Sequence, residues 1–229
     1  MKTVLTIKNA SYRIPFGNLV IDGLNLELQE GHFLGVLGHN GAGKTTLIDL
    51  IMGFRNVTGG VINVFGENPH SLSAELHKEK ISFLSQEVAL KGDISIENFL
   101  QFHSCFYPDY SKEEEGDLLA AFKLNPGQLI GTLSTGQQKK IQIIAGLSTR
   151  PSLIIVDEIT AVLDAETRFL FFQKLRDAVK LKNASVILAT NIAEDLIESA
   201  DSVLFLSQGK AEVHPPNKIL QLFNVRKSA

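Results

Sequence analysis

One stretch of eight residues near the N-terminus, Gly38-His39-Asn40-Gly41-Ala42-Gly43-Lys44-Thr45, constrains this chain more than any other. It fits the pattern G-x-x-x-x-G-K-[ST], which a chain of 229 residues matches by chance in about one case in a hundred at average residue frequencies. The apolar run at residues 33–37 predicts a buried strand before it, and residues 46–53 predict a helix after it that ends at a glycine. Strand, glycine-rich loop and helix in this order predict a loop that wraps around phosphate groups.

The residue types in this loop have separate roles in binding a nucleotide. Gly38, Gly41 and Gly43 allow the backbone to approach the phosphates closely, with N–H groups pointing inward. Lys44 is expected to neutralise the β- and γ-phosphates, and the hydroxyl of Thr45 can ligate Mg²⁺. The other residues expected to contact the nucleotide are Asn40, Ala42 and Thr46.

Composition limits the classes of protein to which the chain can belong. With 229 residues and a hydrophobic content of 44%, it can bury one large core as a single domain, residues 1–229. A net charge of −3 gives no general attraction to nucleic acid, so we expect no nucleic-acid partner. The sequence shows no signal segment and no apolar run of about 18 residues, which predicts a water-soluble cytosolic protein. Its single cysteine, Cys105, excludes an internal disulfide.

Hydrophobic patterning predicts the order of the elements. Residues 3–9 and 19–28 alternate apolar and polar side chains, as antiparallel strands with one exposed face do. Two short strands are predicted at 61–64 and 81–84, and a helix-like segment at 71–80 lies between them.

The second half of the chain changes in character. Apolar residues recur at helical spacing within 93–130, where Ser111 can cap a helix with an acidic first turn. Buried strands are predicted at 152–156, 185–189 and 202–206, alternating with helices as in a parallel sheet. The predicted fold is therefore α/β: a P-loop core with an N-terminal antiparallel β layer and an inserted helical subdomain at about residues 93–150.

Two further motifs follow the P-loop. The run Leu153-Ile154-Ile155-Val156-Asp157-Glu158 is an apolar strand that ends in two carboxylates, at the sheet edge where open α/β folds place ligands. About twenty residues earlier, Leu133-Ser134-Thr135-Gly136-Gln137-Gln138 could by itself be only a helix N-cap. Together the two runs resemble the Walker B motif and the LSGGQ signature of the ATP-binding cassette family, with Thr135 in place of the first signature glycine.

This resemblance covers nearly the whole chain and implies roles for individual residues. Asp157 would hold Mg²⁺ through its water shell, and Glu158 would polarise the water that attacks the γ-phosphate of ATP. Gln86 matches a glutamine that touches Mg²⁺ and the attacking water. For the aromatic residue that stacks on adenine there are two candidates, Tyr12 and Phe16.

The resemblance also implies a dimer. In that family two cassettes meet head to tail, so each ATP lies between one P-loop and the signature of the other subunit. The hydroxyl of Ser134 and the N–H of Gly136 would contact the γ-phosphate from across the interface. The partner is expected to be a second copy or a related cassette, and the residues expected at the dimer interface are Ser134, Thr135, Gly136, Gln137 and Asp164.

Besides Thr135, four positions depart from the family pattern. Asn191 stands where the family has a histidine that contacts the γ-phosphate. Asparagine can donate an N–H but is shorter and cannot become cationic, so the resemblance implies slow hydrolysis. Ile159 replaces a proline after the Walker B glutamate, and Ala161-Val162 replaces a small Ser-Gly pair.

The function that the resemblance implies is that of an ATPase subunit of a membrane transporter. It would use ATP and Mg²⁺ and drive transport through a separate transmembrane permease, at the inner face of the cell membrane. The compact ending after Gly209 is more typical of exporter cassettes. The alternative is an ATP-gated clamp or sensor with little hydrolysis, which the asparagine at position 191 favours. The transported substrate does not follow from the sequence.

Overall fold

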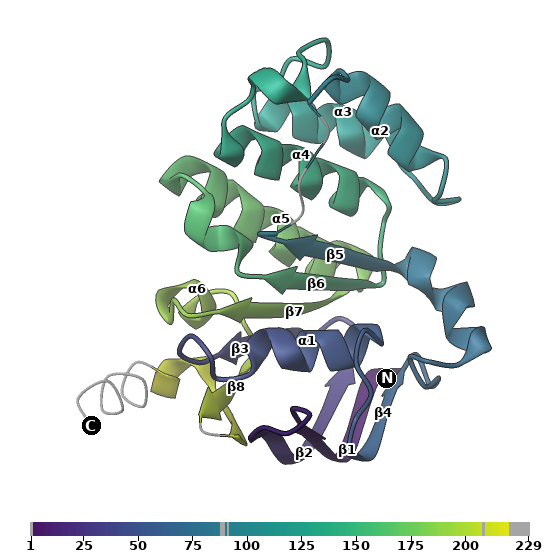
Figure 1. Cartoon of the computed structure of the whole chain (residues 1–229). Helices are drawn as coiled ribbons and strands as arrows, with labels where there is room; N and C mark the ends of the chain where they lie inside the picture. Colours follow the sequence, from purple (N-terminus) through teal and green to yellow (C-terminus); the bar gives the residue numbers. More distant parts are fainter. Residues whose placement is uncertain (1, 88–89, 91, 208, 220–229) are drawn as a thin grey trace.

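The computed structural model describes residues 2–87, 90, 92–207 and 209–219, so the predicted domain ends at 1 and 229 lie outside the described residues. A six-stranded sheet in the order β5-β6-β7-β3-β8-β9 forms its centre (Figure 1). The first five strands in this order are parallel, and β9 pairs antiparallel with β8. The strands are β3 (Phe33–Leu37), β5 (Ile81–Ser85), β6 (Leu153–Asp157), β7 (Ser185–Thr190), β8 (Ser202–Ser207) and β9 (Lys210–His214).

A second, three-stranded antiparallel sheet in the order β2-β1-β4 confirms the predicted N-terminal β layer. Its strands are β1 (Thr3–Arg13), β2 (Leu19–Gln29) and β4 (Gly59–Val64). The helix after the glycine-rich loop, α1 (Lys44–Met52), lies between the two sheets (Figure 1). The inward faces of both sheets and of α1 form one apolar cluster, which fixes the start of α1 in place.

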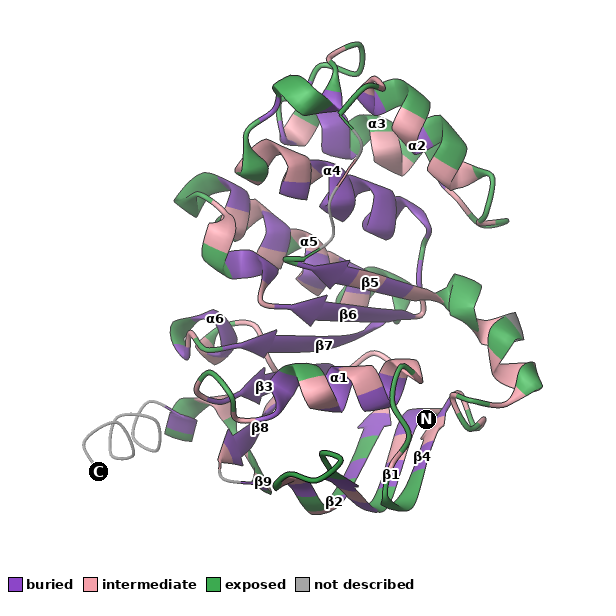
Figure 2. Ribbon diagram, viewed as in Figure 1, coloured by how far each residue is buried: buried purple, intermediate pink, exposed green. Residues whose placement is uncertain are grey.

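Helices cover the other face of the central sheet. They are α2 (Ile96–Ser104), α3 (Lys112–Ala121), α4 (Thr135–Ser148), α5 (Ala165–Lys182) and α6 (Glu194–Ile197). Short 3₁₀ turns lie elsewhere along the chain: η1 (Leu72–Lys80), η2 (Ile130–Thr132), η3 (Ile159–Val162) and η4 (Pro216–Lys218). Three of the helices, α2 to α4, lie within the range predicted for the helical subdomain. Figure 2 shows that strands β5 to β7 and much of α4 are buried, and their apolar residues belong to one core cluster. Ser111 caps α3 as expected, because its side chain accepts a hydrogen bond from the N–H of Glu114 at 3.2 Å.

The parallel strands bring the predicted motifs to one edge of the sheet. Their carboxyl ends lie in register: Ser85 pairs with Asp157, Asp157 with Ala189, and Leu37 with Thr190. The residues that follow these strands therefore share what we call the carboxyl edge. In the described part of the chain, no helix is long and apolar enough to cross a membrane.

Candidate nucleotide site

The glycine-rich loop has the backbone shape that the sequence predicts. Gly43 caps α1 in the left-handed region, with a φ of 101°. A Cβ atom at Gly43 would lie 2.8 Å from Cγ1 of Val20, and one at Gly38 would lie 2.8 Å from the carbonyl oxygen of Leu206. Side chains at these positions would therefore collide with their surroundings, so the loop can close around an anion only with glycine here.

Lys44 is the buried cation of this loop, with its side chain 3% exposed. Its Nζ donates to the carbonyl oxygens of Gly38 at 2.9 Å and His39 at 3.2 Å. It also forms an ion pair with a carboxylate oxygen of Glu158 at 3.0 Å. A buried charge needs such partners, and phosphate oxygens can supply the same negative charge in their place.

Asp157, at the end of β6, has the properties of a metal ligand. Burial is the main cause that raises the pKa of its carboxyl group, with Glu158 adding to the rise, while a hydrogen bond from Thr45 and the charge of Lys44 oppose it. Its Oδ1 atom is buried and has no hydrogen-bond partner. A buried, unpartnered carboxylate oxygen beside a threonine hydroxyl suits Mg²⁺, which prefers hard oxygen ligands. The residues present therefore fit the ion.

Glu158, Gln86 and Asn191 surround these groups on the carboxyl edge. Glu158 has a φ of 53°, a conformation that a non-glycine residue adopts at a cost and that recurs at functional sites. Gln86 is exposed, and its backbone N–H donates to the carbonyl oxygen of Asp157 at 3.3 Å. The amide of Asn191 donates to Oδ1 of Asn40 in the P-loop at 3.1 Å. The structure thus brings all three predicted catalytic residues to the edge where the P-loop begins.

The cleft around the P-loop has an aliphatic end, formed by Ile14 and Val20, and the two candidates for the adenine-stacking residue lie outside its lining. Tyr12 is only 7% exposed, packs in the core between the sheets, and accepts a hydrogen bond from Arg55 at 3.2 Å. Phe16 is fully exposed at the tip of the β1–β2 turn. Neither ring is among the described residues that line the cleft, which are Ile14, Val20, Asn40, Gly41, Gly43, Lys44, Thr45, Thr46 and Glu158.

The signature segment, residues 133–138, forms a separate group. Ser134 caps α4, and its side chain and that of Gln137 bond each other's backbone N–H groups, at 3.3 Å and 3.0 Å. A Cβ at Gly136 would lie 3.6 Å from the carbonyl oxygen of Val162, so the start of α4 adjoins the loop before Asp164. Thr135 and Asp164 are exposed. Of the described residues, none from this group lines the P-loop cleft.

Lys139 is a further residue that contacts this site, and none of the sequence motifs includes it. It lies on α4 one turn after the signature, is 3% exposed, and donates to the carbonyl oxygens of Gln86 at 2.6 Å and Ser85 at 3.2 Å. Burial lowers the pKa of its ammonium group. The lysine thereby attaches the signature helix to the backbone that carries Gln86. Residues three apart are neighbours on the surface of a helix. The position of Lys139 three residues after Gly136 is therefore the signal in the sequence that could have revealed it.

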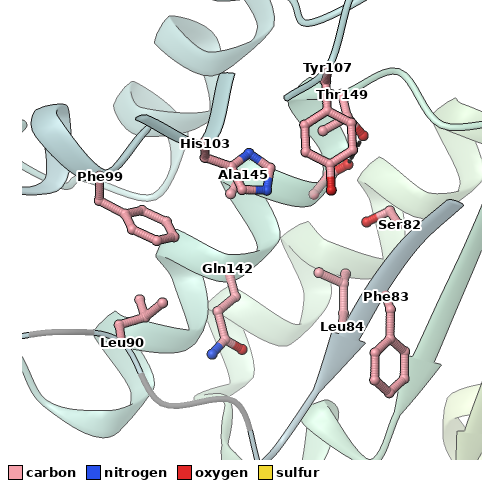
Figure 3. Close-up of a pocket in the computed structure, with 11 residues that line it drawn as sticks. Ser82, Phe83, Leu84, Leu90, Phe99, His103, Tyr107, Gln142, Ala145 and Thr149 are labelled. Carbon is pink, nitrogen blue, oxygen red and sulfur yellow. Dashed lines mark hydrogen bonds between the residues drawn. The ribbon is translucent and has the colours of Figure 1, made fainter. Parts of the chain in front are cut away.

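A second cavity of about 150 Å³ opens between β5 and the helices α2 and α4 (Figure 3). We call it the aromatic cavity, because Phe83, Phe99, His103 and Tyr107 are part of its wall. The rings of His103 and Tyr107 stack with centroids 4.8 Å apart. The cavity thus lies where the helical subdomain meets the sheet.

Comparison with known proteins identifies a family that this chain resembles along most of its length. A family model described as "ABC transporter" matches residues 21–161. The chain is 30% identical over 230 residues to ABC transporter G family member 20 of Dictyostelium discoideum. The aligned region covers 97% of this chain but 31% of that protein. The chain is 26% identical to the choline transport ATP-binding protein OpuBA of Bacillus subtilis, over 95% of this chain and 59% of that protein. The chain therefore spans less than two thirds of the length of these relatives.

Solved structures share the fold. An ATP-binding subunit of an ABC transporter superimposes with a TM-score of 0.85 at 23% identity, over 98% of this chain and 95% of that one. An ATP-binding cassette solved as a dimer in a post-hydrolysis state with ADP and Pi superimposes with a TM-score of 0.79 at 22% identity, over 93% and 98%. The family model covers more than half of the chain and includes the P-loop, the signature and the strand that ends in Asp157 and Glu158. The chain belongs to the ABC transporter family, and its fold is that of the family's ATP-binding cassettes.

Proposed function

We propose that this cassette binds ATP with Mg²⁺ and hydrolyses it between two subunits, and so drives transport through a separate transmembrane partner. The observation that carries the proposal is the ion pair between Lys44 and Glu158, 3.0 Å long, beside the buried carboxylate of Asp157. A phosphate-binding cation, a base and a metal ligand then lie within one site, as hydrolysis of a phosphoanhydride requires.

Different residues of the chain would take different parts in the reaction. Lys44 would exchange its bonds to Glu158 and the loop carbonyls for bonds to phosphate oxygens, which frees Glu158 to accept a proton from the attacking water. Thr45 and Asp157 would hold Mg²⁺, and Gln86, whose backbone bonds that of Asp157, would contact the ion as well. The ion, when bound, supplies positive charge against the charge that builds up on the phosphate oxygens. Asn191 would donate an N–H to the γ-phosphate.

The dimer follows from the separation of the two groups of residues. Ser134 and Gly136 lie at an exposed helix start that does not line the P-loop cleft of their own chain, as far as the described residues go. Such a helix start favours an anion, so a second cassette could present its nucleotide there. We propose that the second cassette is another copy or a close relative.

The membrane partner would dock beside the aromatic cavity. Phe54 is 62% exposed and packs edge-on against Phe83 of the cavity wall, with ring centroids 6.3 Å apart. Phe102 on α2 and Phe106 just after the end of α2 contact each other, and both are mostly exposed. Exposed aromatic rings around a cavity are typical of protein interfaces. We place the cassette on the cytoplasmic side of the membrane, held there by a permease.

A single substitution tests hydrolysis. Glu158→Gln keeps the volume of the side chain but removes the base, so it should lower kcat by about 10²–10⁴-fold while ATP still binds and dimers accumulate. Lys44→Ala is the matched control, because it removes the phosphate-binding cation and should abolish ATP binding itself. ATP hydrolysis by Glu158→Gln at the wild-type rate would show that Glu158 is not the base.

The second candidate function is an ATP-gated clamp, and Asn191 favours it. A clamp would bind ATP, dimerise and hydrolyse it only slowly, with or without a membrane partner. Steady-state ATPase rates of the wild type, measured alone and together with the permease that copurifies with it, separate the two functions. A rate that the permease stimulates supports the transporter, and a rate that stays near zero supports the clamp.

A further inference from the structure

Asp195, in α6, is nearly fully buried behind the loop that carries Asn191. Its side chain is 3% exposed. A buried carboxylate is costly unless other groups bind it. Asp195 is not among the described residues that line the P-loop cleft, so it does not bind the nucleotide directly.

One oxygen of Asp195 holds two loops of the carboxyl edge. Oδ2 accepts a hydrogen bond from the hydroxyl of Thr160 at 2.9 Å and another from that of Thr190 at 3.4 Å. Thr160 lies two residues after Glu158, in η3. Thr190 is the last residue of β7, directly before Asn191. The base and the γ-phosphate donor are therefore each attached to the same carboxylate by a short stretch of chain.

The other oxygen holds a third segment. Oδ1 accepts a hydrogen bond from Nε of Arg168 at 2.7 Å and a second one from the same guanidinium group. Arg168 lies in the first turns of α5, and its N–H donates to the carbonyl oxygen of the N-cap residue Asp164 at 2.8 Å. Asp164 is one of the residues expected at the dimer interface. Two N–H groups of the guanidinium bond this oxygen, so a charge-assisted pair links the start of α5 to α6.

We propose that Asp195 is a positioning residue that holds three segments of the hydrolysis site in one arrangement: the loop after β6, the loop after β7 and the start of α5. The inference rests on the proposed function. Glu158 has a left-handed backbone, which persists only where its surroundings hold it. The bond from Thr160 to a buried carboxylate provides such support. A shift of α5 at the dimer interface would also reach Glu158 and Asn191 through this carboxylate.

The test separates catalysis from binding and from stability. Asp195→Asn preserves the shape of the side chain but removes its charge, so the three segments should lose their common anchor. We expect kcat to fall about 10- to 100-fold, while the Kd for ATP changes by less than about twofold, because the P-loop contacts remain. Leu175→Val is the control: it perturbs the core of α5 without touching this network, and kcat should stay near the wild-type value.

A double-mutant cycle shows whether Asp195 acts through Thr160. Thr160→Val should lower kcat alone but add little in an Asp195→Ala background, because no side-chain oxygen is left there to accept the bond. Additive losses, or an unchanged kcat in Asp195→Asn beside an active wild type, would overturn this inference alone. A wild type with no ATPase activity would overturn the proposed function and this inference with it.

Discussion

At the scale of single residues, the charge on Asp157 works against stability. Its pKa is raised, mainly by burial, so the folded chain holds this proton more tightly than the unfolded chain does. The contribution to stability is then greatest at low pH and is lost as pH rises from 3.8, the ordinary pKa of an aspartate carboxyl, through the folded pKa. The ionised carboxylate destabilises the fold, which a bound cation would offset.

We therefore expect Asp157→Asn to raise the melting temperature of the nucleotide-free protein at pH 7, by about 2–4 °C if the gain is about 1 kcal/mol. The same variant should lose the further stabilisation that Mg²⁺ adds in the presence of ATP. Thermal unfolding with and without the two ligands measures both effects. Thr45→Val is the comparison: it removes a metal ligand and also a hydrogen bond to the buried carboxylate, so it should lose the Mg²⁺ stabilisation without raising the melting temperature of the nucleotide-free protein. A lower melting temperature for nucleotide-free Asp157→Asn would contradict the argument.

Asn191 carries the second prediction at this scale. Its amide lies 3.1 Å from Asn40 of the P-loop, within reach of the phosphate site but without a charge to offer. Asn191→His should raise kcat several-fold with little change in the Kd for ATP, because a longer imidazole contacts a phosphate that gains charge mainly in the transition state. Asn191→Ala should be slower than the wild type. ATPase rates that are equal in all three proteins would show that residue 191 has no such role.

At the scale of elements, α2 carries a histidine that makes its packing sensitive to pH. His103 stacks on Tyr107 and lies near Phe99 and Tyr110, with ring centroids 6.0 Å and 6.1 Å away. Burial lowers the pKa of its imidazole below 6.5, and the charge of Glu115 only partly opposes this. As pH falls, the unfolded chain therefore takes up this proton at a higher pH than the folded chain does. The fold loses stability as pH falls from 6.5 toward the folded pKa.

His103→Phe should remove this contribution, since a phenyl ring fills the same aromatic surroundings without taking up a proton. Melting temperatures of the wild type and the variant, measured from about pH 7.5 to about pH 5.5, should diverge toward the acidic end, with the wild type falling further. His70→Phe, at an exposed position on another segment, is the matched control and should follow the wild type. Parallel curves for His103→Phe and the wild type would contradict the prediction.

The elements also show what the sequence could and could not predict. The P-loop, the strand that ends in Asp157 and the cap at Ser111 each carry a local signal, and the structure has a loop, a strand and a helix at those places. The register of the β1–β2 pair carries no such local signal, and it shifts several times between Ile7 and Arg13. A shift of one residue moves each side chain to the other face of a sheet. Alternation alone could therefore not decide that Tyr12 faces the core while Ile14 faces the cleft.

Contacts between segments that are far apart in the sequence could not be predicted either. Asp195 meets Thr160 and Arg168 only because the loops after β6 and β7 lie side by side at the carboxyl edge. Neither partner forms a recognisable motif with it. Strand β9 was not predicted, because its short sequence is mostly exposed and pairs only at the edge of the sheet.

At the scale of the whole molecule, the separation of the signature from the P-loop cleft makes a prediction about mixed dimers. Lys44→Ala should inactivate both sites of a dimer, because each site needs one P-loop. Gly136→Asp should do the same through the signature: a carboxylate is tolerated at a helix start but repels the phosphate of the partner's nucleotide. A Cβ at Gly136 meets no atom closer than 3.6 Å, so this variant is expected to fold.

A dimer with one chain of each kind would hold one intact site, formed by the P-loop of the Gly136→Asp chain and the signature of the Lys44→Ala chain. If two copies of this chain form the sites, mixed dimers isolated through two different affinity tags should hydrolyse ATP at about half the wild-type rate, since one of two equivalent sites remains. Each variant paired with itself should be inactive, and this pairing is the control. Mixed dimers that form but stay inactive would show that the sites are not shared between copies, and a failure of tagged wild-type chains to pair would point to a related cassette as the natural partner.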